Sequence, residues 1–367
     1  MKVDFSTDYL SLSDYVSRLL AGASLPSIQE TNPLVVANKV HFLLKDVSSE
    51  PLQRKIQADM HKAFRQQKAL LDLNKILNAE KTPFLLIKGL ALNQLLHGNK
   101  LCRPSLDIDL LVSPGNVFKT DEQLIAAGFK RHSPDFTLKD AQKRATLKMF
   151  DQFLYHHPES KINLELHWRL FRNDYILPLS FEELWANRQS IDMGPATFFT
   201  LSNSHYLAYL LLHAFQHSWE RLMWMVDVYL LSKKLEKKEV GHFLELSKQY
   251  RFEKEAGVGF ALIEMILKAK DLPTEIRAII SEKHREKAAV FPYYIPDCLK
   301  KSPNHESISY KVKRLLLEAE YTPGIRSRLF YLYNYPLFMY RYVQLPAALD
   351  FLYPLFWPYV FVRNKLK

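Results

Sequence analysis

The sequence predicts an α+β protein in which a small mixed-sheet core follows a helical N-terminal cap and precedes a helical C-terminal region. Short apolar runs bounded by glycine and proline, which are typical of strands, gather between residues 81 and 200. Residues 1–80 and 201–367 instead show mainly helical apolar spacing. A chain of 367 residues is also long enough for two or three packed units. These three ranges are therefore the predicted domains.

The clearest helix of the N-terminal cap is predicted from Ile56 to Ala79. Its apolar residues recur at helical spacing between charged residues, namely Met60, Ala63, Phe64, Leu70, Leu71 and Leu77. Pro83 ends this pattern, and the following PFLLIKG is a short apolar run stopped by a glycine, as expected of a buried strand.

A second helix and strand follow. The segment LALNQLLHG is predicted as a short helix in which Leu92, Leu95 and Leu96 share one face and which ends at Gly98. Leu106 to Val112 then forms the second predicted strand. Beyond Pro114, NVFKTDEQLIAAGF combines an asparagine start, helical apolar spacing and a glycine stop, so it should cover the sheet as a helix.

An antiparallel hairpin is predicted next, from two β-rich runs, 150–157 and 161–168, that flank Pro158-Glu159-Ser160. After Ser202 the pattern becomes helical, with breaks expected at Pro273, Pro292, Pro296, Pro303 and Pro323.

Composition limits the class of protein. Hydrophobic residues make up 48% and charged residues 24%, which excludes a disordered or collagen-like chain. The two cysteines, Cys102 and Cys298, form no metal-binding pattern, and the first residues, MKVDFSTDYL, lack the order of a signal peptide, so we expect a cytoplasmic protein. The net charge of +11 favours nucleotides, nucleic acid or anionic lipid as partners. Nucleic acid is the least expected, because no basic-aromatic RNA motif or recognition helix is evident.

Two aspartates are predicted to share one face of the second strand. In SLDIDLLV, alternation places Leu106, Ile108 and Leu110 on one face and Asp107 and Asp109 on the other. Two carboxylates about 4 Å apart repel by roughly 4 kcal/mol at an effective dielectric near 20, so they require a cation, a proton or a basic partner.

Glu165 adds a third acid. In INLELHW the apolar residues alternate with Asn163, Glu165 and His167, so Glu165 leaves the opposite face of its strand. Three carboxylates suit Mg²⁺, or Mn²⁺ in its place, which completes its shell with water and substrate phosphates. A metal site of this kind is typical of enzymes that catalyse phosphoryl transfer.

These elements together resemble the polymerase-β nucleotidyltransferase superfamily: a strand ending in a glycine turn, a short helix, an Asp-x-Asp strand and an acid on a later strand. More narrowly, IKGLAL, RPSLDIDLLV, NLELHWRL and LLHAFQHSWERLMWMVDV resemble an uncharacterised bacterial nucleotidyltransferase family often associated with polysaccharide gene clusters. The resemblance implies metal binding and catalysis by Asp107, Asp109 and Glu165, and phosphate binding by the turn at Lys88 and Gly89.

One position departs from the superfamily pattern. The turn is usually Gly-Ser or Gly-Gly, whereas Gly89 is followed here by Leu90, which has no hydroxyl. The phosphates would then be held by the Gly89 amide, the start of the following helix and the Lys88 ammonium. Arg103 beside Pro104 has two interpretations, as a triphosphate ligand or as an exposed loop residue.

A polar stripe is predicted on the helix after Ser204. His213, His217, Arg221, Trp224 and Asp227 follow steps of four, four, three and three residues, and so should share one helical face. The stripe, together with His167, either contributes to the substrate cleft or hydrogen-bonds within an interface with the nucleotidyltransferase-like domain. A zinc site is not expected, because the glutamate of HExxH is missing.

Three functions from different classes fit these features. The first is a metal-dependent enzyme that moves a nucleotidyl group from a nucleoside triphosphate to an unknown hydroxyl or phosphate acceptor. The second is a catalytically silent nucleotide-binding or interaction module, which the missing serine favours. The third, a glycosyltransferase that uses Asp-x-Asp, ranks last because the residues before the motif look helical instead of strand-rich.

The last 43 residues, Ile325 to Lys367, are aromatic and basic. Tyr342 to Val362 is long enough to span a bilayer, but Asp350 and three prolines argue against a regular transmembrane helix. The tail either packs the helical domain as a last core element or docks peripherally on anionic membrane through its aromatic residues and its cations, Arg326, Arg328, Arg341, Arg363, Lys365 and Lys367.

Overall fold

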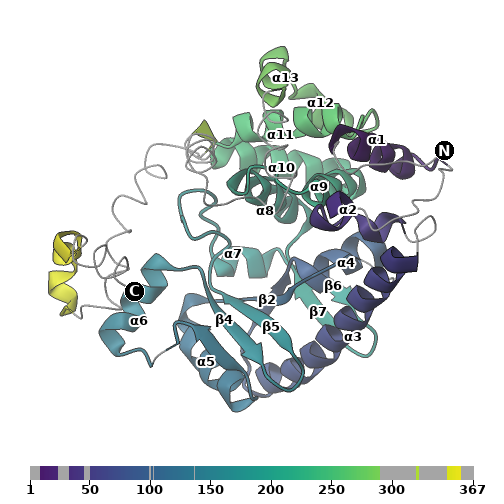
Figure 1. The fold of residues 1–367 in the computed structure, drawn as a ribbon. Helices are drawn as coiled ribbons and strands as arrows, with labels where there is room; N and C mark the ends of the chain where they lie inside the picture. The colour runs from purple at the N-terminus through teal and green to yellow at the C-terminus, as the bar shows by residue number, and fades with distance from the viewer. Residues whose placement is uncertain are drawn as a thin grey trace.

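The computed structural model describes residues 9–23, 33–44, 50–98, 101, 103–135, 137–289, 320–321 and 345–356. Across this part of the chain, one mixed sheet of seven strands packs between two groups of helices (Figure 1). The predicted α+β class is therefore confirmed.

The sheet has the order β3-β4-β5-β2-β1-β7-β6. Its centre is β2, which pairs with β1 antiparallel and with β5 parallel. The hairpin predicted around Pro158 is confirmed as β4 and β5. The strands are β1 (Phe84–Ile87), β2 (Asp107–Val112), β3 (Lys130–Ser133), β4 (Gln152–His157), β5 (Ile162–His167), β6 (Gln189–Asp192) and β7 (Thr197–Thr200).

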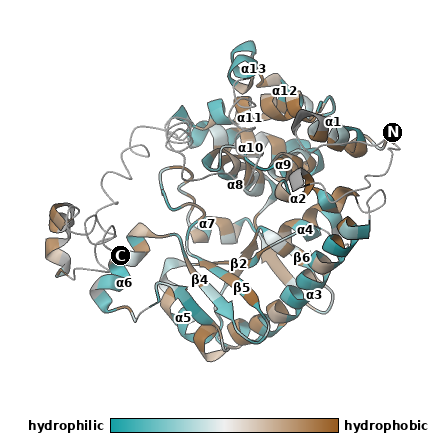
Figure 2. Cartoon of the chain, in the orientation of Figure 1, coloured by the Kyte–Doolittle hydropathy of each residue, from teal (hydrophilic) through white to brown (hydrophobic). Residues whose placement is uncertain are grey.

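Alternation along the central strands divides the core in two. Ile108 and Leu110 of β2 face a core shared with α3 (Glu50–Ala79) and α5 (Val117–Ala126). Leu111 joins a second core on the other side, made with the helices after residue 203. Because side chains alternate, Asp107 and Asp109 point with Leu111 toward that helical half. Figure 2 shows hydrophobic and hydrophilic residues following one another along the central strands and along α3, as expected of elements with one buried face and one polar face.

Two details of the predicted elements were wrong. Leu106 precedes β2 and is 53% exposed, so it does not share the buried face of Ile108 and Leu110. Phe64 of α3 is 55% exposed, because the buried stripe runs through Ala63, Leu70 and Leu77 and Phe64 is rotated from it by about 100°.

Several short elements were not predicted. β3, α6 (Asp140–Met149) and α7 (Phe181–Ala186) flank the hairpin strands in the chain, and β6 with β7 extends the sheet at its other edge. Thr200 of β7 donates a hydrogen bond from Oγ1 to Leu86 O at 2.6 Å. Strands of four residues carry too little alternation to be recognised from sequence.

The helical half contains α4 (Gly89–His97), next to the sheet, and six helices from α8 to α13: α8 (Asn203–Gln216), α9 (Leu222–Lys234), α10 (Lys237–Gln249), α11 (Glu253–Ile266), α12 (Thr274–Ala278) and α13 (Glu282–Ala288). N-terminal elements join it as well: α1 (Tyr9–Leu20), α2 (Pro33–Ala37) and the 3₁₀ helix η1 (His41–Leu44). For example, Ser17 of α1 donates a hydrogen bond to Leu267 O, just after α11.

The prediction that a single helix carries the polar stripe was wrong. α8 ends at Gln216, and the chain turns through Ser218 and Trp219, whose φ values of 51° and 54° lie in the left-handed region, before α9 begins. Neither glycine nor proline marks this turn, so the sequence gives no ordinary signal for it.

The C-terminal prediction falls largely outside the described residues. Cys102, Cys298, Pro292, Pro296, Pro303, Pro323 and the tail apart from 345–356 all lie there. Residues Ala347–Phe356 form a 3₁₀ helix, η5, in which Leu355 is 73% exposed. None of the helices within the described ranges has the length and apolar character needed to cross a bilayer.

Candidate functional site

Two carboxylates lie side by side at the centre of the sheet. The parallel register of β2 and β5 pairs Asp109 directly with Glu165, and Asp107 with Asn163 one step earlier. Asp109 and Glu165 extend from the sheet face that is directed to the helical half, because their neighbours Ile108, Leu164 and Leu166 face the opposite core. The strand pairing thus brings together two acids that are 56 positions apart in the sequence.

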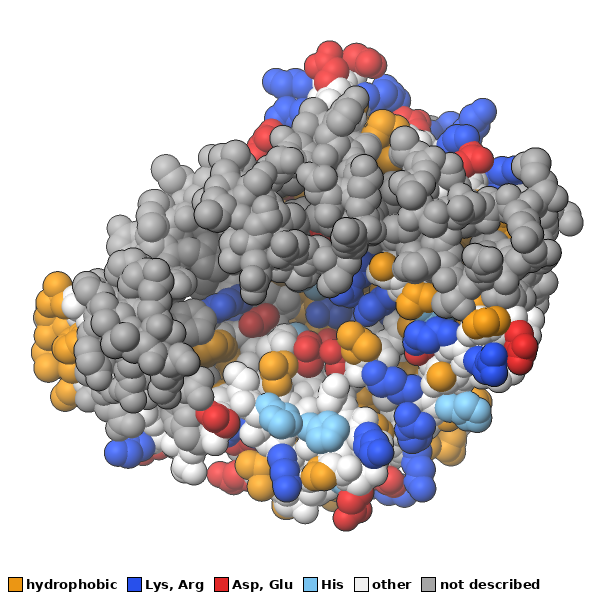
Figure 3. Space-filling model, in the orientation of Figure 1, with side chains coloured by type: hydrophobic (Ala, Val, Ile, Leu, Met, Phe, Trp, Pro, Cys, Tyr) orange, Lys and Arg blue, Asp and Glu red, His pale blue; other side chains and the backbone are white. Residues whose placement is uncertain are grey.

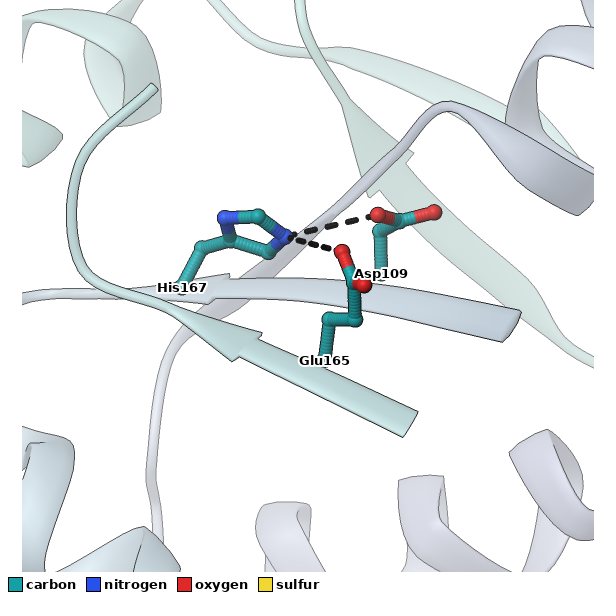
Figure 4. A group of neighbouring side chains, drawn as sticks. All are labelled: Asp109, Glu165 and His167. Atoms are coloured by element: carbon teal, nitrogen blue, oxygen red, sulfur yellow. Dashed lines mark hydrogen bonds and ion pairs between the residues drawn. The ribbon is translucent and has the colours of Figure 1, made fainter. Parts of the chain in front are cut away.

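His167, at the end of β5, contacts both carboxylates of this pair. Its Nε2 lies 3.3 Å from Asp109 Oδ1 and 3.2 Å from Glu165 Oε2, and the ring is 1% exposed (Figure 4). Burial would lower the pKa of His167, but the hydrogen bonds to the two carboxylates raise it to about 9. Burial likewise opposes ionisation of Glu165, yet the bond to His167 lowers its pKa to about 2. The trio therefore forms a charged network.

Asp107 borders the same cavity, but it is not part of this trio. Its pKa is raised to about 7, first by burial and then by the charges of Asp109 and Glu165. Asp107 is thus electrostatically coupled to the pair, whereas the third group that could share a cation with them is His167.

Lys88 and Gly89 form the turn between β1 and α4, beside the acids. Lys88 has φ 57° and places Nζ 3.6 Å from Asp109 Oδ1 and 5.5 Å from the centre of the Tyr209 ring. Gly89 has φ 39°, and a Cβ there would lie 3.1 Å from Ser105 Oγ and 3.3 Å from Asp107 O. Only glycine fits without strain this close to the start of β2.

Arg103 and Asp227 form a buried ion pair. Arg103 donates from Nε to Asp227 Oδ1 at 2.9 Å and from Nη2 to Oδ2 at 2.7 Å, and both side chains are at most 7% exposed. The Arg103 amide also donates to Asn93 Oδ1 at 3.0 Å. The interpretation of Arg103 as an exposed loop residue was wrong, because this pair joins the loop before β2 to α9.

The remaining stripe residues meet where α8 turns into α9. The rings of His213 and His217 have centroids 4.6 Å apart, and each contacts Trp224, at 5.7 Å and 5.2 Å. The guanidinium of Arg221 lies 5.2 Å from the centre of the Trp224 ring. Burial first, and then nearby cations including Lys88, hold the pKa of His213 well below its usual range, so its imidazole is neutral.

These groups border one cavity of about 650 Å³ between the sheet and the helical half. Its wall includes the three acids on one side and His213, His217 and Arg221 on the other. Figure 3 shows acidic and basic side chains next to each other in the hollow at the centre of this face. Asp227 is absent from the described lining, since its carboxylate is directed to Arg103.

The wall also includes residues that sequence reasoning missed, among them Lys39, Ser105 and Arg172. Lys39 lies in the turn between α2 and η1, far in sequence from the aspartate, glutamate and histidine motifs. Ser105 stands within RPSLDIDL, and its hydroxyl donates to Asp107 O at 2.8 Å. A positional signal existed only for Ser105, through its place beside the aspartates.

The donor set fits a divalent metal. Asp109, Glu165 and His167 each offer one ligand atom, and these atoms lie within 4.8 Å of one another. Carboxylate oxygens suit Mg²⁺ and Mn²⁺, and an imidazole is more usual with a transition metal such as Mn²⁺. A cation here would replace the positive charge that Lys88 and His167 supply to the acids.

The chain matches the model of a known protein family. The model of a family described as an uncharacterised nucleotidyltransferase matches residues 29–268, which is more than half of the 367 residues. This range contains the cavity residues from Lys39 to Trp224. None of the curated proteins matches the chain.

Proposed function

This chain belongs to the uncharacterised nucleotidyltransferase family, and from that premise we propose that it transfers a nucleotidyl group from a nucleoside triphosphate to a hydroxyl or phosphate acceptor. In this reaction an acceptor oxygen bonds to the α-phosphorus, the bond from that phosphorus to the bridging oxygen breaks, and pyrophosphate leaves with the electron pair. The acceptor proton passes to a nearby base or to water.

The observation that carries the proposal is the pairing of Asp109 with Glu165 across parallel strands, at the wall of a cavity of about 650 Å³. A volume of that size falls within the range of small-molecule sites. The two acids and His167 would hold Mg²⁺ or Mn²⁺, which when bound neutralises phosphate charge and aligns the reacting oxygens. Among the described residues of this wall, no other group concentrates so much negative charge.

Three residues next to the acid pair, Asp107, Gly89 and Lys88, have further roles in this proposal. Asp107, on the same strand face, accepts a second cation or the acceptor proton, since its raised pKa of about 7 suits a proton acceptor near neutral pH. The Gly89 turn lets the start of α4 approach a phosphate closely, because no Cβ stands in the way. Lys88 balances the acids before the substrates arrive.

One observation favours the second candidate, a nucleotide-binding module without catalysis. Lys88 and His167 already balance the carboxylates, and Leu90 offers no hydroxyl at the position where the superfamily usually has serine. In such a module the nucleotide would bind, but pyrophosphate would not be released.

The test is a screen of the full chain with each nucleoside triphosphate, with and without Mg²⁺ or Mn²⁺. Thermal shift measures binding, and pyrophosphate release measures turnover in the presence of cell-extract acceptors or water. We expect metal-dependent release with at least one triphosphate. Binding without release supports the silent module, and the absence of both contradicts the proposal.

Asp109→Asn is the decisive variant. It should lower pyrophosphate release about 100-fold or more, because it removes a ligand charge from the metal, while the thermal midpoint stays within a few degrees. Glu159→Gln, which changes an exposed acid of the β4–β5 turn, is the matched control and should have full activity. Equal release by wild type and Asp109→Asn would exclude catalysis at this cluster.

A further inference from the structure

Lys39 lies in a turn that is bonded to a helix far along the chain. Asn38, with 0% exposure, accepts a hydrogen bond from Leu222 N on its side-chain Oδ1 at 3.0 Å. Its backbone oxygen accepts a second from Met223 N at 3.3 Å. The turn between α2 and η1 therefore caps the first turn of α9, across 184 positions of sequence.

This bonding brings two cations to the same end of α9. Lys39 follows Asn38 directly, and Arg221 immediately precedes α9. Both line the cavity that contains the acids. Lys39 has φ 54°, a left-handed conformation that is unfavourable for lysine and is maintained here by the two bonds of Asn38.

These two cations differ from Arg103 and Lys88, which also line the wall. Arg103 is paired with Asp227, and Lys88 has Asp109 at 3.6 Å. Within the described ranges, neither Lys39 nor Arg221 has a carboxylate within 4.0 Å, and Arg221 instead stacks on Trp224. Burial first, and then the positive charges of Arg221 and Arg103, lower the pKa of Lys39 to about 8. Lys39, Arg221 and Arg103 thus bring positive charge to one side of the cavity, where Glu220 is an acid that also lines the wall.

The opposite side has an excess of acid. Asp107, Asp109 and Glu165 leave the sheet there, and Asp107 is near enough for its charge to act on Lys39. A ligand that carries several negative charges, and that brings a metal on its other side, complements both sides at once. A polyphosphate chain has this distribution of charge.

We propose that Lys39 and Arg221 bind the polyphosphate chain of the nucleoside triphosphate, so that the helical half supplies the phosphate ligands and the sheet supplies the metal ligands. This assignment rests on the proposed function for the identity of the ligand. It also accounts for the absence of a hydroxyl after Gly89, because two side chains from outside the sheet bind the phosphates in place of the missing serine.

The test compares the affinity of the full chain for three probes: a nucleoside triphosphate, the corresponding nucleoside and inorganic tripolyphosphate without metal. Lys39→Met and Arg221→Gln should each weaken binding of the two phosphorylated probes about tenfold, and Lys39→Arg should restore most of it. Nucleoside affinity should be unchanged. Lys68→Met and Arg54→Gln remove exposed cations of α3 and should bind all probes as wild type does.

Folding is checked by thermal unfolding, and Arg221→Lys keeps the charge if Arg221→Gln is unstable. Equal affinity of wild type, Lys39→Met and Arg221→Gln for the triphosphate would overturn the assignment while leaving the proposed function intact. Lys39-dependent binding of tripolyphosphate without pyrophosphate release from any triphosphate would support the assignment and contradict the proposed function. If wild type binds neither phosphorylated probe, both are wrong.

Discussion

His167 is the residue that most changes the chemistry of the site. An acid pair on adjacent strands needs a compensating charge, and His167 provides it through contacts of 3.3 Å and 3.2 Å. The same ring nitrogen would face a metal held by Asp109 and Glu165. Metal binding therefore requires His167 to release a proton, which makes a metal ligand of a group that otherwise neutralises the acids.

His205 of α8 provides a test of pH-dependent stability outside the site. Burial, and then nearby His242, lower its pKa to about 4. Its Nδ1 is 2.7 Å from Ser202 Oγ, and Glu183, at 3.9 Å from Nε2, is too distant to hydrogen-bond. The unfolded state, with a pKa near 6.5, binds more protons between these values. The contribution of neutral His205 is therefore full above about pH 6.5 and is lost as the pH falls toward 4.

We expect this residue to account for about 2 kcal/mol of the stability lost between pH 7.5 and pH 5. Urea unfolding at both pH values gives the difference in free energy of unfolding between pH 7.5 and pH 5. We expect this difference to be about 2 kcal/mol smaller in His205→Gln than in wild type. His132→Gln changes an exposed histidine and should keep the wild-type difference. An undiminished difference in His205→Gln would mean that His205 is protonated normally.

For single residues, the sequence predicted the strand face from which a side chain extends, because this depends only on alternation. Asp107, Asp109 and Glu165 were expected to leave the faces opposite their apolar neighbours, and Ile108, Leu164 and Leu166 do lie in the other core. Lys39 could not be predicted, because its position depends on the two bonds of Asn38 with α9. Contacts between residues so distant in sequence leave no local pattern.

Among the elements, the loop before β2 and helix α9 are joined by Arg103 and Asp227. Arg103→Met should lower the free energy of unfolding by about 3–5 kcal/mol, because it leaves the buried Asp227 carboxylate without its cation. Arg103→Met/Asp227→Leu should recover most of this loss, since no charge then stays buried. Denaturant unfolding measures both.

The control is Arg54→Met, which removes one partner of an exposed pair with Glu50 and should change stability by about 0.5 kcal/mol or less. A loss below about 1 kcal/mol in Arg103→Met, combined with weakened triphosphate binding, would instead support the prediction that Arg103 is a nucleotide ligand. The two roles of Arg103 thus have separate measurements.

Long or strongly patterned elements were predicted well and short ones were not. α3, α5 and the β4–β5 hairpin carry enough apolar periodicity or turn chemistry to be recognised, whereas β6 and β7 have four residues each. The break between α8 and α9 was missed because the left-handed residues there are Ser218 and Trp219 instead of glycine. Tertiary packing, not local preference, produces that turn.

For the whole molecule, the peripheral membrane hypothesis can be tested with vesicles. The intact chain should sediment with anionic vesicles more than with neutral ones at low salt, because its aromatic-basic tail combines apolar and positive groups. Leu349 and Leu355 of η5 are exposed, so Leu349→Ser/Leu355→Ser should weaken sedimentation severalfold. A chain that ends near Pro323 should not sediment. Failure of the intact protein to sediment with anionic vesicles would exclude the hypothesis.

The bonds of Asn38 also have a consequence for synthesis at the ribosome. The turn at Lys39 emerges early, but the two hydrogen-bond donors of Asn38, Leu222 and Met223, are made 184 and 185 residues after it. The sheet strands, which end at Thr200, precede those donors as well. A nascent chain can therefore pair β2 with β5 while Lys39 still lacks its fixed position. If Lys39 binds the substrate phosphates as proposed, we expect phosphate binding only after α9 has left the exit tunnel, near the end of translation of the matched region.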